Sequence, residues 1–411
     1  MERNHAMNGS HVSVMGYFSA VLALGCFISC SVVHRPPATV ASIITDGDAA
    51  RSVQRDTIDT MLDGLARRAV ARGDRTLDLL MLSGGGQHGA YGIGFLRGWR
   101  SRTDTPMPRF DLVTGISTGA LQAPFALLGT EEALNAAAAL YGKAVDDFAP
   151  TFDWLFWLRR TGGLIETSRF QHMIETVFDE RLCRQLRPQF ETGRQLAIAT
   201  TDFDLGIGRI WDIGQETDCS PTSLARVHKL LLATTAIPGI FPPVVIDEHV
   251  HADGGIVANL LPVLDLDGYR RLAARLRALG VTDRVTVRLW IVINLWTHPT
   301  PTVIDPSDRS AMSQRGTLLL FWTQQSQLLA RLADLARAVS ADVPGLNVEM
   351  RYTAIPSELA TEPGANMLFD EAWMLRLEKL GYERARSTSP WDEIGSPYER
   401  PSPIESRSSQ Q

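Results

Sequence analysis

The 411-residue sequence has no excess of positive charge. Its 40 Lys and Arg residues are outnumbered by 46 Asp and Glu residues, which gives a formal net charge of −6. It also contains no run of Lys and Arg that would suit a polyanion. We therefore expect no nucleic-acid partner. Hydrophobic residues at 45% and charged residues at 21% are ordinary values for a globular enzyme.

Cysteine is also scarce, with four residues in the chain. Cys26 and Cys30 lie near the N-terminus, so the body of the protein holds Cys183 and Cys219 alone. Nothing in their spacing suggests a zinc site, and no calcium-loop pattern is present. The sequence therefore implies no metal and no cofactor. Cys183 and Cys219 either form one disulfide in an oxidising compartment or remain separate buried thiols.

The N-terminus lacks charge altogether between Arg3 and Arg35, and its centre is rich in Val, Leu, Ala, Phe and Ile. It resembles a secretory leader, and Cys26 and Cys30 follow small residues as in bacterial lipoprotein signals. We expect residues 1–33 to be a signal peptide or lipoprotein leader of an exported protein. The protein is then membrane-anchored through one of these cysteines, or periplasmic or secreted. An uncleaved membrane anchor and a buried helix are the alternatives.

The rest of the sequence alternates between strand-like apolar runs and helical patterns. Residues 34–75 are expected to form a linker, over 34–55, and an N-terminal helix. Residues 76–385 are expected to form one domain, and the segment 386–411, rich in Ser, Pro and charge, a disordered tail. The expected strands are 77–83, 110–114, 195–201, 209–213, 250–253, 285–294 and 347–353. The expected helices include 131–145, 170–178, 223–234, 269–279, 318–339 and 369–381.

This alternation favours an α/β fold. We expect three α/β/α layers, in which a largely parallel central sheet carries helices on both faces. No internal repeat is present.

The motif GISTG follows the strand 110–114 and precedes a helix that starts at Ala120. A serine on a strained strand-to-helix turn is exposed for nucleophilic attack, which makes Ser117 the candidate nucleophile. The turn brings neighbouring backbone very close, so side chains at Gly115 and Gly119 would clash. The alternative is a plain tight turn between strand and helix.

The motif GGGQHG follows the strand 77–83 and ends at Gly89. Successive glycines allow backbone N–H groups to converge on one oxygen, and the start of a helix favours negative charge. These groups suit the oxyanion that a serine creates at an ester carbonyl. We expect an oxyanion hole in which Gly85 and Gly86 donate hydrogen bonds and Gly84 shapes the turn.

A rival interpretation treats the same loop as a nucleotide-binding site. Gly84, Gly86 and Gly89 satisfy G-x-G-x-x-G, and Asp104 lies near the place of a ribose-binding acid. The chain would then be a nucleotide-binding or interaction module without hydrolytic activity. This interpretation leaves GISTG unexplained.

The motif HADGG supplies a carboxylate at the end of a strand. Asp253 is followed by Gly254 and Gly255, so it can reach into a site from a tight turn. It is placed to accept the hydroxyl proton of Ser117 directly, which would give a two-residue centre. The alternative is a turn aspartate that bonds its own backbone.

Two histidines offer other bases. His298 follows the strand 285–294, and the order Ser117, Asp253, His298 matches the order of a serine–acid–histidine triad in α/β-hydrolases. His251 alternates with Asp253 along one strand, so both side chains are expected on one face.

The three motifs, in this order, resemble those of the patatin-like phospholipases. The segment TTAIPGIFPP at 234–243 also resembles the one that precedes the family's aspartate, and the similarity is good over 77–262. The resemblance implies that Ser117 is the nucleophile, that Asp253 is its base and that residues 84–86 form the oxyanion hole. No histidine is required.

The resemblance also implies a carboxylic ester of a lipid as substrate, cleaved through an acyl-enzyme without a cofactor. One position departs from the family, which commonly carries Arg or Lys where this chain has His88; a permanent positive charge is lost there. The aromatic segment 153–160, DWLFWLRR, would line an acyl channel, touch a membrane or be buried.

Overall fold

The computed structural model of the protein describes residues 33, 35–143, 151–152, 162–365, 367 and 369–392. The leader with Cys26 and Cys30, the aromatic segment 153–160 and the chain beyond Asp392 lie outside the described residues. Within the described part, the helices are too short or too polar to span a bilayer.

The strands follow the predicted apolar runs closely. They are β1 (Thr76–Leu82), β2 (Leu112–Gly115), β3 (Thr151–Phe152), β4 (Ile165–Glu166), β5 (Gln195–Asp202), β6 (Ile207–Asp212), β7 (Val244–Ile246), β8 (His249–Asp253), β9 (Val285–Ile293) and β10 (Leu346–Ala354). An eight-stranded sheet has the order β10-β9-β1-β2-β5-β8-β7, and β6 also pairs with β5; β3 and β4 form a separate pair.

The strands from β10 to β5 run parallel, whereas β6 and β8 are antiparallel to β5, and β7 is antiparallel to β8. The prediction of a largely parallel sheet is therefore confirmed.

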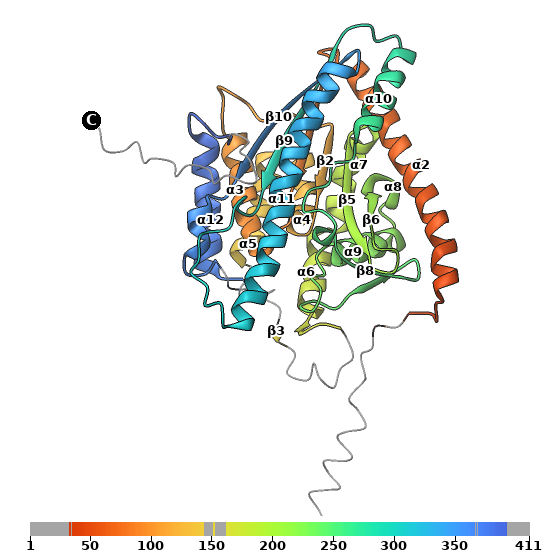
Figure 1. Ribbon diagram of the computed structural model, residues 1–411. Coiled ribbons are helices and arrows are strands. Elements are labelled where there is room, and N and C mark those ends of the chain that lie inside the picture. Colours follow the sequence, from red (N-terminus) through yellow and green to blue (C-terminus); the bar gives the residue numbers. More distant parts are fainter. Residues whose placement is uncertain are drawn as a thin grey trace, which may run out of the picture.

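Helices connect and cover these strands (Figure 1). The α-helices are α2 (Val40–Arg72), α3 (Gly89–Arg100), α4 (Thr118–Leu128), α5 (Glu131–Lys143), α6 (Ser168–Val177), α7 (Glu180–Glu191), α8 (Ile213–Glu216), α9 (Pro221–Thr234), α10 (Leu266–Ala278), α11 (Arg309–Asp342) and α12 (Glu371–Arg386). Short 3-10 helices are η2 (Gly86–His88), η3 (Gly254–Ile256) and η4 (Ser357–Thr361).

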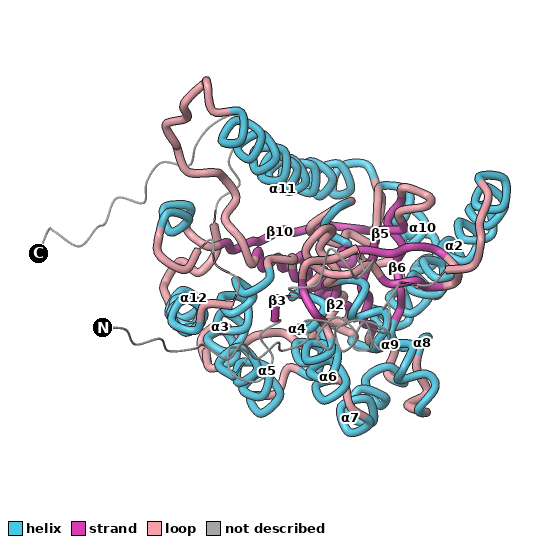
Figure 2. The backbone as a smooth tube through the Cα atoms, turned by 90° about the horizontal axis from the view of Figure 1, so that it is seen from below, coloured by secondary structure: helices cyan, strands magenta, loops and turns pink. Residues whose placement is uncertain are grey.

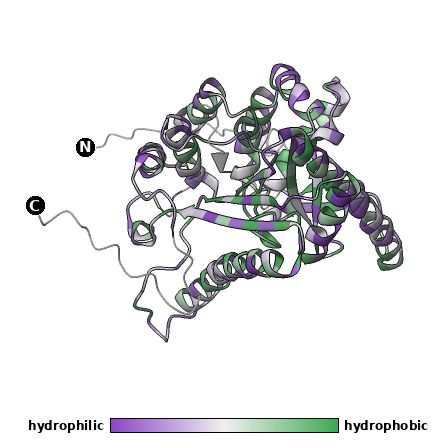
Figure 3. Ribbon diagram, turned by 90° about the horizontal axis from the view of Figure 1, so that it is seen from above, coloured by the Kyte–Doolittle hydropathy of each residue, from purple (hydrophilic) through white to green (hydrophobic). Residues whose placement is uncertain are grey.

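The sheet lies between two helical layers, as Figure 2 shows. Alternation along β1 explains this arrangement, because successive side chains of a strand point to opposite faces. Leu77 and Leu79 join the core formed with α2, α10 and α11, whereas Leu80 and Leu82 join the core formed with α3, α4, α7 and α9. Hydrophobic residues accordingly gather on the strands and on the helix sides around them (Figure 3). The predicted three-layer α/β/α fold is confirmed.

The N-terminal helix begins earlier than predicted. Residues 34–55 were expected to be a linker because they are polar, but α2 already starts at Val40. The side chain of Thr39 accepts a hydrogen bond from the amide of Ser42, and the Ser42 hydroxyl bonds back to Thr39, which forms a capping box. Polar composition here reflects an exposed helix face rather than an unstructured segment.

The ordered C-terminal region also extends further than expected. The tail was predicted to be disordered from residue 386, but Trp391 packs against Trp99 and Trp290, with ring centroids 5.0 and 5.2 Å apart. Asp392 accepts a hydrogen bond from Arg384 at 2.6 Å. These contacts attach the chain to the domain up to Asp392.

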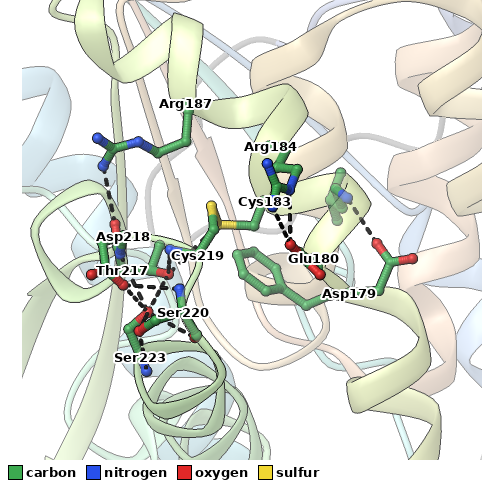
Figure 4. The surroundings of a disulfide bond; sticks show 12 residues. Asp179, Glu180, Cys183, Arg184, Arg187, Thr217, Asp218, Cys219, Ser220 and Ser223 are labelled. Atoms are coloured by element: carbon green, nitrogen blue, oxygen red, sulfur yellow. Dashed lines mark hydrogen bonds and ion pairs between the residues drawn. A yellow bond between two sulfur atoms is a disulfide. The ribbon is translucent and has the colours of Figure 1, made fainter.

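The helix α7 was missed by the sequence analysis, although Asp179 caps its first turn by accepting a hydrogen bond from the amide of Leu182. Cys183 on this helix forms a disulfide with Cys219, which precedes α9, and the Cα atoms are 5.8 Å apart (Figure 4). Of the two alternatives for these cysteines, the bonded one is observed. The disulfide joins α7 to the start of α9 on one face of the sheet.

Candidate active site

Ser117 lies in the turn between β2 and α4. Its backbone has φ 52° and ψ −124°, a conformation that is strained for a residue with a side chain. A Cβ atom at Gly115 would come within 2.4 Å of the Gly119 carbonyl oxygen, and one at Gly119 within 2.4 Å of the Leu82 oxygen. The clash predicted at both glycines is confirmed, and it explains how the strained serine is accommodated.

Neighbouring elements hold the serine in place. Its amide donates a hydrogen bond of 3.2 Å to the hydroxyl of Thr234, which in turn donates to the Ala199 carbonyl at 2.6 Å. The turn is therefore attached both to the end of α9 and to β5. No pattern in the sequence indicated that Thr234 would hold the serine turn, although it is the first residue of the TTAIPGIFPP segment.

Asp253 lies at the end of β8, beside the serine. The Ser117 side chain interacts with its carboxyl group closely enough to lower the pKa of that group. The Gly255 amide donates to the same carboxyl at 2.7 Å, and the Asp253 amide donates to the Ala236 carbonyl at 2.9 Å. The two residues lie far apart in the sequence, and the sheet brings them into contact because β8 pairs with β5 beside β2.

The Asp253 carboxyl is almost completely buried. Burial raises its pKa from 3.8 to about 6, while the hydrogen bonds from Ser117 and Gly255 oppose this increase. Loss of hydration disfavours a buried carboxylate, and hydrogen-bond donors favour it. A carboxyl group with this pKa is ionised at neutral pH and remains a stronger base than an exposed aspartate.

The glycine loop lies against the same turn. A Cβ atom at Gly84 would meet Ser117 Cβ at 3.1 Å, and one at Gly85 would meet the Asn294 carbonyl oxygen at 2.2 Å. Gly86 has a φ of 56°, a conformation that glycine adopts at little cost. Within the described residues, the amides of Gly85 and Gly86 donate no hydrogen bond. Both donors remain available to an oxygen bound beside Ser117.

Two asparagines fix this loop, and the sequence analysis did not identify them. The Gly84 amide donates to the Asn259 carbonyl at 3.4 Å, and the Asn294 side-chain amide donates to the Ser83 carbonyl at 2.8 Å. Each asparagine follows an apolar stretch of the sequence. A polar residue at the end of such a stretch is the feature by which the sequence could have identified it.

His88 follows the loop and is buried. Its two ring nitrogens lie 2.8 Å from the Gly85 carbonyl oxygen and 3.1 Å from that of Ala365. Burial lowers its pKa, against the effect of the two carbonyl groups. The imidazole therefore connects the glycine loop to the segment before α12. The resemblance to the patatin-like phospholipases implies a permanent cation at the position of His88.

The other candidate residues lie elsewhere. His298 follows β9 and contacts Thr297 through Nδ1 at 3.0 Å, and the Ser117–Asp253 contact has no histidine between its partners. His251 shares β8 with Asp253, but its Nδ1 contacts Thr200 at 2.9 Å and burial lowers its pKa to about 4. Neither position is that of a base bonded to the serine.

The position of Asp104 does not support the nucleotide-binding interpretation. Asp104 lies before β2 in the loop after α3, where it forms an ion pair of 2.5 Å with Arg102. A ribose-binding acid would instead follow a strand at its carboxyl end.

An apolar pocket that is open to solvent lies beside Ser117 and Gly86. Helices α4, α5 and α6 and the segment after α9 contribute its hydrophobic lining, including Leu121, Leu140, Met173 and Phe241. Such a pocket suits a hydrocarbon chain attached to the group that the serine contacts. Leu121, Leu140 and Met173 come from separate helices and no motif marks them, whereas Phe241 belongs to the TTAIPGIFPP segment.

The fold and these contacts define a class. A three-layer α/β/α protein with a strained serine beside a buried carboxyl, a glycine loop and an apolar pocket has the features of a hydrolase that acts on acyl groups.

Comparison with known families is more specific. Residues 80–267 match the family model of the patatin-like phospholipases, so the chain contains a patatin-like phospholipase domain. This match supports a lipid acyl hydrolase in general.

Other comparisons add little. The crystal structure of VipD from Legionella pneumophila is 14% identical, with a TM-score of 0.34; the alignment covers 75% of this chain and 66% of that one. The chain thus spans just under two thirds of the length of VipD. A likeness this weak transfers no property of VipD. No curated protein matches the sequence.

Proposed function

We propose that the protein hydrolyses carboxylic esters of lipids through a catalytic dyad of Ser117 and Asp253. The observation that carries this proposal is the position of the strained serine beside the buried carboxyl of Asp253, next to an apolar pocket. The patatin-like domain supports the lipid ester as substrate. The residues of the pocket accept the acyl chain, and the scissile carbonyl lies at Ser117.

The reaction has two halves. In the first, Ser117 Oγ attacks the ester carbonyl while ionised Asp253 accepts the hydroxyl proton. The amides of Gly85 and Gly86 donate hydrogen bonds to the tetrahedral oxyanion, each worth about 2.7–4 kcal/mol in such a site. Collapse of this intermediate breaks the bond to the alcohol, which leaves with the proton from Asp253 and an acyl group on the serine.

In the second half, a water molecule attacks the acyl-enzyme. Asp253 accepts a proton from the water, and the same amides bind the second oxyanion. Collapse breaks the bond to Ser117 Oγ, which takes the proton back from Asp253, and the fatty acid leaves. The dyad thus returns to its starting protonation state.

A fluorophosphonate probe tests the nucleophile. Labelling of the wild-type protein but not of Ser117→Ala is expected. Labelling that persists in Ser117→Ala would contradict the assignment of Ser117 as the nucleophile. No labelling of the wild type under any detergent condition would favour a binding module.

We further propose that the protein is exported and attached to a membrane through its N-terminal region. The uncharged apolar leader supports export, and so does the Cys183–Cys219 disulfide, since such bonds persist in oxidising compartments. Cell fractionation of wild type and a Cys26→Ser, Cys30→Ser double variant tests the lipid anchor. Release of the double variant from the membrane fraction is expected.

A further inference from the structure

Two short motifs place four metal-ligand side chains together. In the ladder between β5 and β8, Asp202 pairs with His251. The Phe203 amide continues this pairing by donating to the Val250 carbonyl at 2.8 Å. Alternate residues of paired strands share a face. The side chains of Asp202 and Asp204 are therefore expected on the same face as those of His249 and His251. The D-x-D motif thus lies opposite the H-x-H motif.

The ligand atoms lie close together. One oxygen from each of Asp202 and Asp204 and one nitrogen of His249 all lie within 4.8 Å of one another. His249 Nδ1 is 2.8 Å from Asp202 Oδ2, and His251 Nε2 is 3.9 Å from the same oxygen. Ligands of tetrahedral zinc, at about 2.0–2.2 Å from the ion, lie roughly 3.3–3.6 Å apart. Metal binding therefore requires these three side chains to adjust, and His251, which lies outside this group of three, to move closer to Asp204 and His249.

The strongest single observation concerns His251, which is 1% exposed. Its Nε2 is fully buried, makes no hydrogen bond within the described residues and points toward the Asp202 carboxylate. Leaving a buried polar atom without a partner is costly, so such an atom calls for an explanation. Its other nitrogen, Nδ1, lies 2.9 Å from the Thr200 hydroxyl oxygen. When Nδ1–H donates to Thr200, Nε2 presents a lone pair to the cluster.

We propose that Asp202, Asp204, His249 and His251 bind one divalent metal ion of the zinc type. Two carboxylate oxygens and two imidazole nitrogens suit tetrahedral Zn²⁺, whereas Ca²⁺ and Mg²⁺ prefer oxygen ligands alone. No cysteine takes part, so the cysteine spacing that argued against a metal did not bear on this cluster.

Outer partners support the site. Metal-binding histidines usually donate a hydrogen bond from the N–H of their second ring nitrogen to a carboxylate or another oxygen. The Thr200 hydroxyl provides that oxygen for His251. The Asp46 carboxylate on α2 is the nearest such group to His249, with 3.7 Å between Oδ2 and Nε2, which is longer than a hydrogen bond. The ion would thus connect α2, the β5–β6 turn and the strand that ends in Asp253.

Without a metal, the same carboxylates have other partners. Asp202 is 3.5 Å from Arg209, and Asp204 is 2.7 Å from Arg35. An ion-pair network is therefore the competing account of the cluster. The two accounts can be distinguished by measurement, because an ion-pair network binds no metal. It also gives no role to His251 Nε2.

The test uses full-length protein without a histidine tag, treated with EDTA and dialysed. Titration calorimetry with Zn²⁺ is expected to show one equivalent bound, together with a higher melting temperature. Co²⁺ in its place is expected to give the visible absorption of a tetrahedral ion. In His251→Gln the affinity should fall by more than the roughly 10–100-fold typical of losing an outer-shell partner. This variant removes the contact between Nδ1 and Thr200 but no hydrogen bond of Nε2, and we expect it to fold.

Two variants serve as controls. His172 on α6 is exposed and lies 4.0 Å from Glu175, so His172→Gln removes a surface histidine–carboxylate pair and should bind the metal as wild type does. Ser117→Ala should also bind as wild type does, which separates this proposal from the esterase activity. Absence of binding in the wild type, or equal affinity in His251→Gln, overturns the proposal. Weak binding of several equivalents, reduced equally in His172→Gln, also overturns it.

Discussion

Turnover is expected to require the ionised form of Asp253. Burial raises the pKa of this carboxyl from 3.8 to about 6, a difference that corresponds to about 3 kcal/mol in favour of the neutral form. Below pH about 6 the base is protonated, so kcat/KM should fall by about tenfold for each pH unit, and it should be constant above that value.

The raised pKa also means that ionised Asp253 lowers the free energy of unfolding. A carboxyl with a raised pKa stabilises the folded state below its unfolded pKa, and this contribution is lost as the pH rises through about 6. The ionised group therefore destabilises the protein at neutral pH. Replacing it by neutral Asn in Asp253→Asn should raise the free energy of unfolding by about 1–3 kcal/mol. The same change should lower kcat by roughly 100- to 10,000-fold, as expected for loss of a general base.

The assay follows hydrolysis of a soluble chromogenic ester across the pH range, with urea unfolding of both proteins at neutral and acidic pH. The stability difference between wild type and Asp253→Asn should shrink as the pH falls below about 6 and vanish below 3.8, where the carboxyl is protonated in both the folded and the unfolded state. Because histidine titrates near the same pH, His298→Ala is the necessary control and should keep both the rate and the pH profile. An inactive but folded His298→Ala protein, or an active Asp253→Asn protein, would refute the dyad.

Three further outcomes are expected. Gly85→Ala places a Cβ atom 2.2 Å from the Asn294 carbonyl oxygen, so the loop must move, and loss of one oxyanion donor should lower kcat by about 100- to 1000-fold without changing the circular dichroism spectrum. Ala137→Phe fills the pocket beside α5, and a series of ester chain lengths should show a loss of kcat/KM for long acyl chains but little change for short ones. Replacing both Cys183 and Cys219 by Ser removes a cross-link over 36 residues, which should lower the free energy of unfolding by about 3–4 kcal/mol in urea under oxidising conditions; equal stability of wild type and variant there would mean that the bond does not form.

Local sequence patterns determined most of the secondary structure and the turns at the site. Apolar runs buried on both faces marked the parallel strands, because side chains in the middle layer meet helices on either side. The tight turn at Ser117 predicts glycine at positions 115 and 119, because backbone atoms lie where a Cβ atom of either residue would be. The clash at Gly115 involves Gly119 of the same turn and is therefore readable in one segment, whereas the clash at Gly119 involves Leu82 of β1.

Composition was a poorer guide where exposure, rather than structure, sets residue type. The polar residues from Val40 onward form the exposed side of α2, and Trp391 joins an aromatic cluster although its neighbours are Ser, Pro and charged residues. Helix formation and packing at these places depend on the rest of the domain.

The contact between Ser117 and Asp253 shows where the sequence stops and tertiary structure decides. The motifs identified both residues, but the two lie side by side because β8 adds to β5 in a register that aligns Asp253 with Thr200. The raised pKa, the apolar pocket and the facing of Asp202 and His251 have the same origin. Steric and hydrogen-bonding preferences act between neighbours in the chain, whereas burial and the distance between remote side chains are set by how strands pair and helices pack.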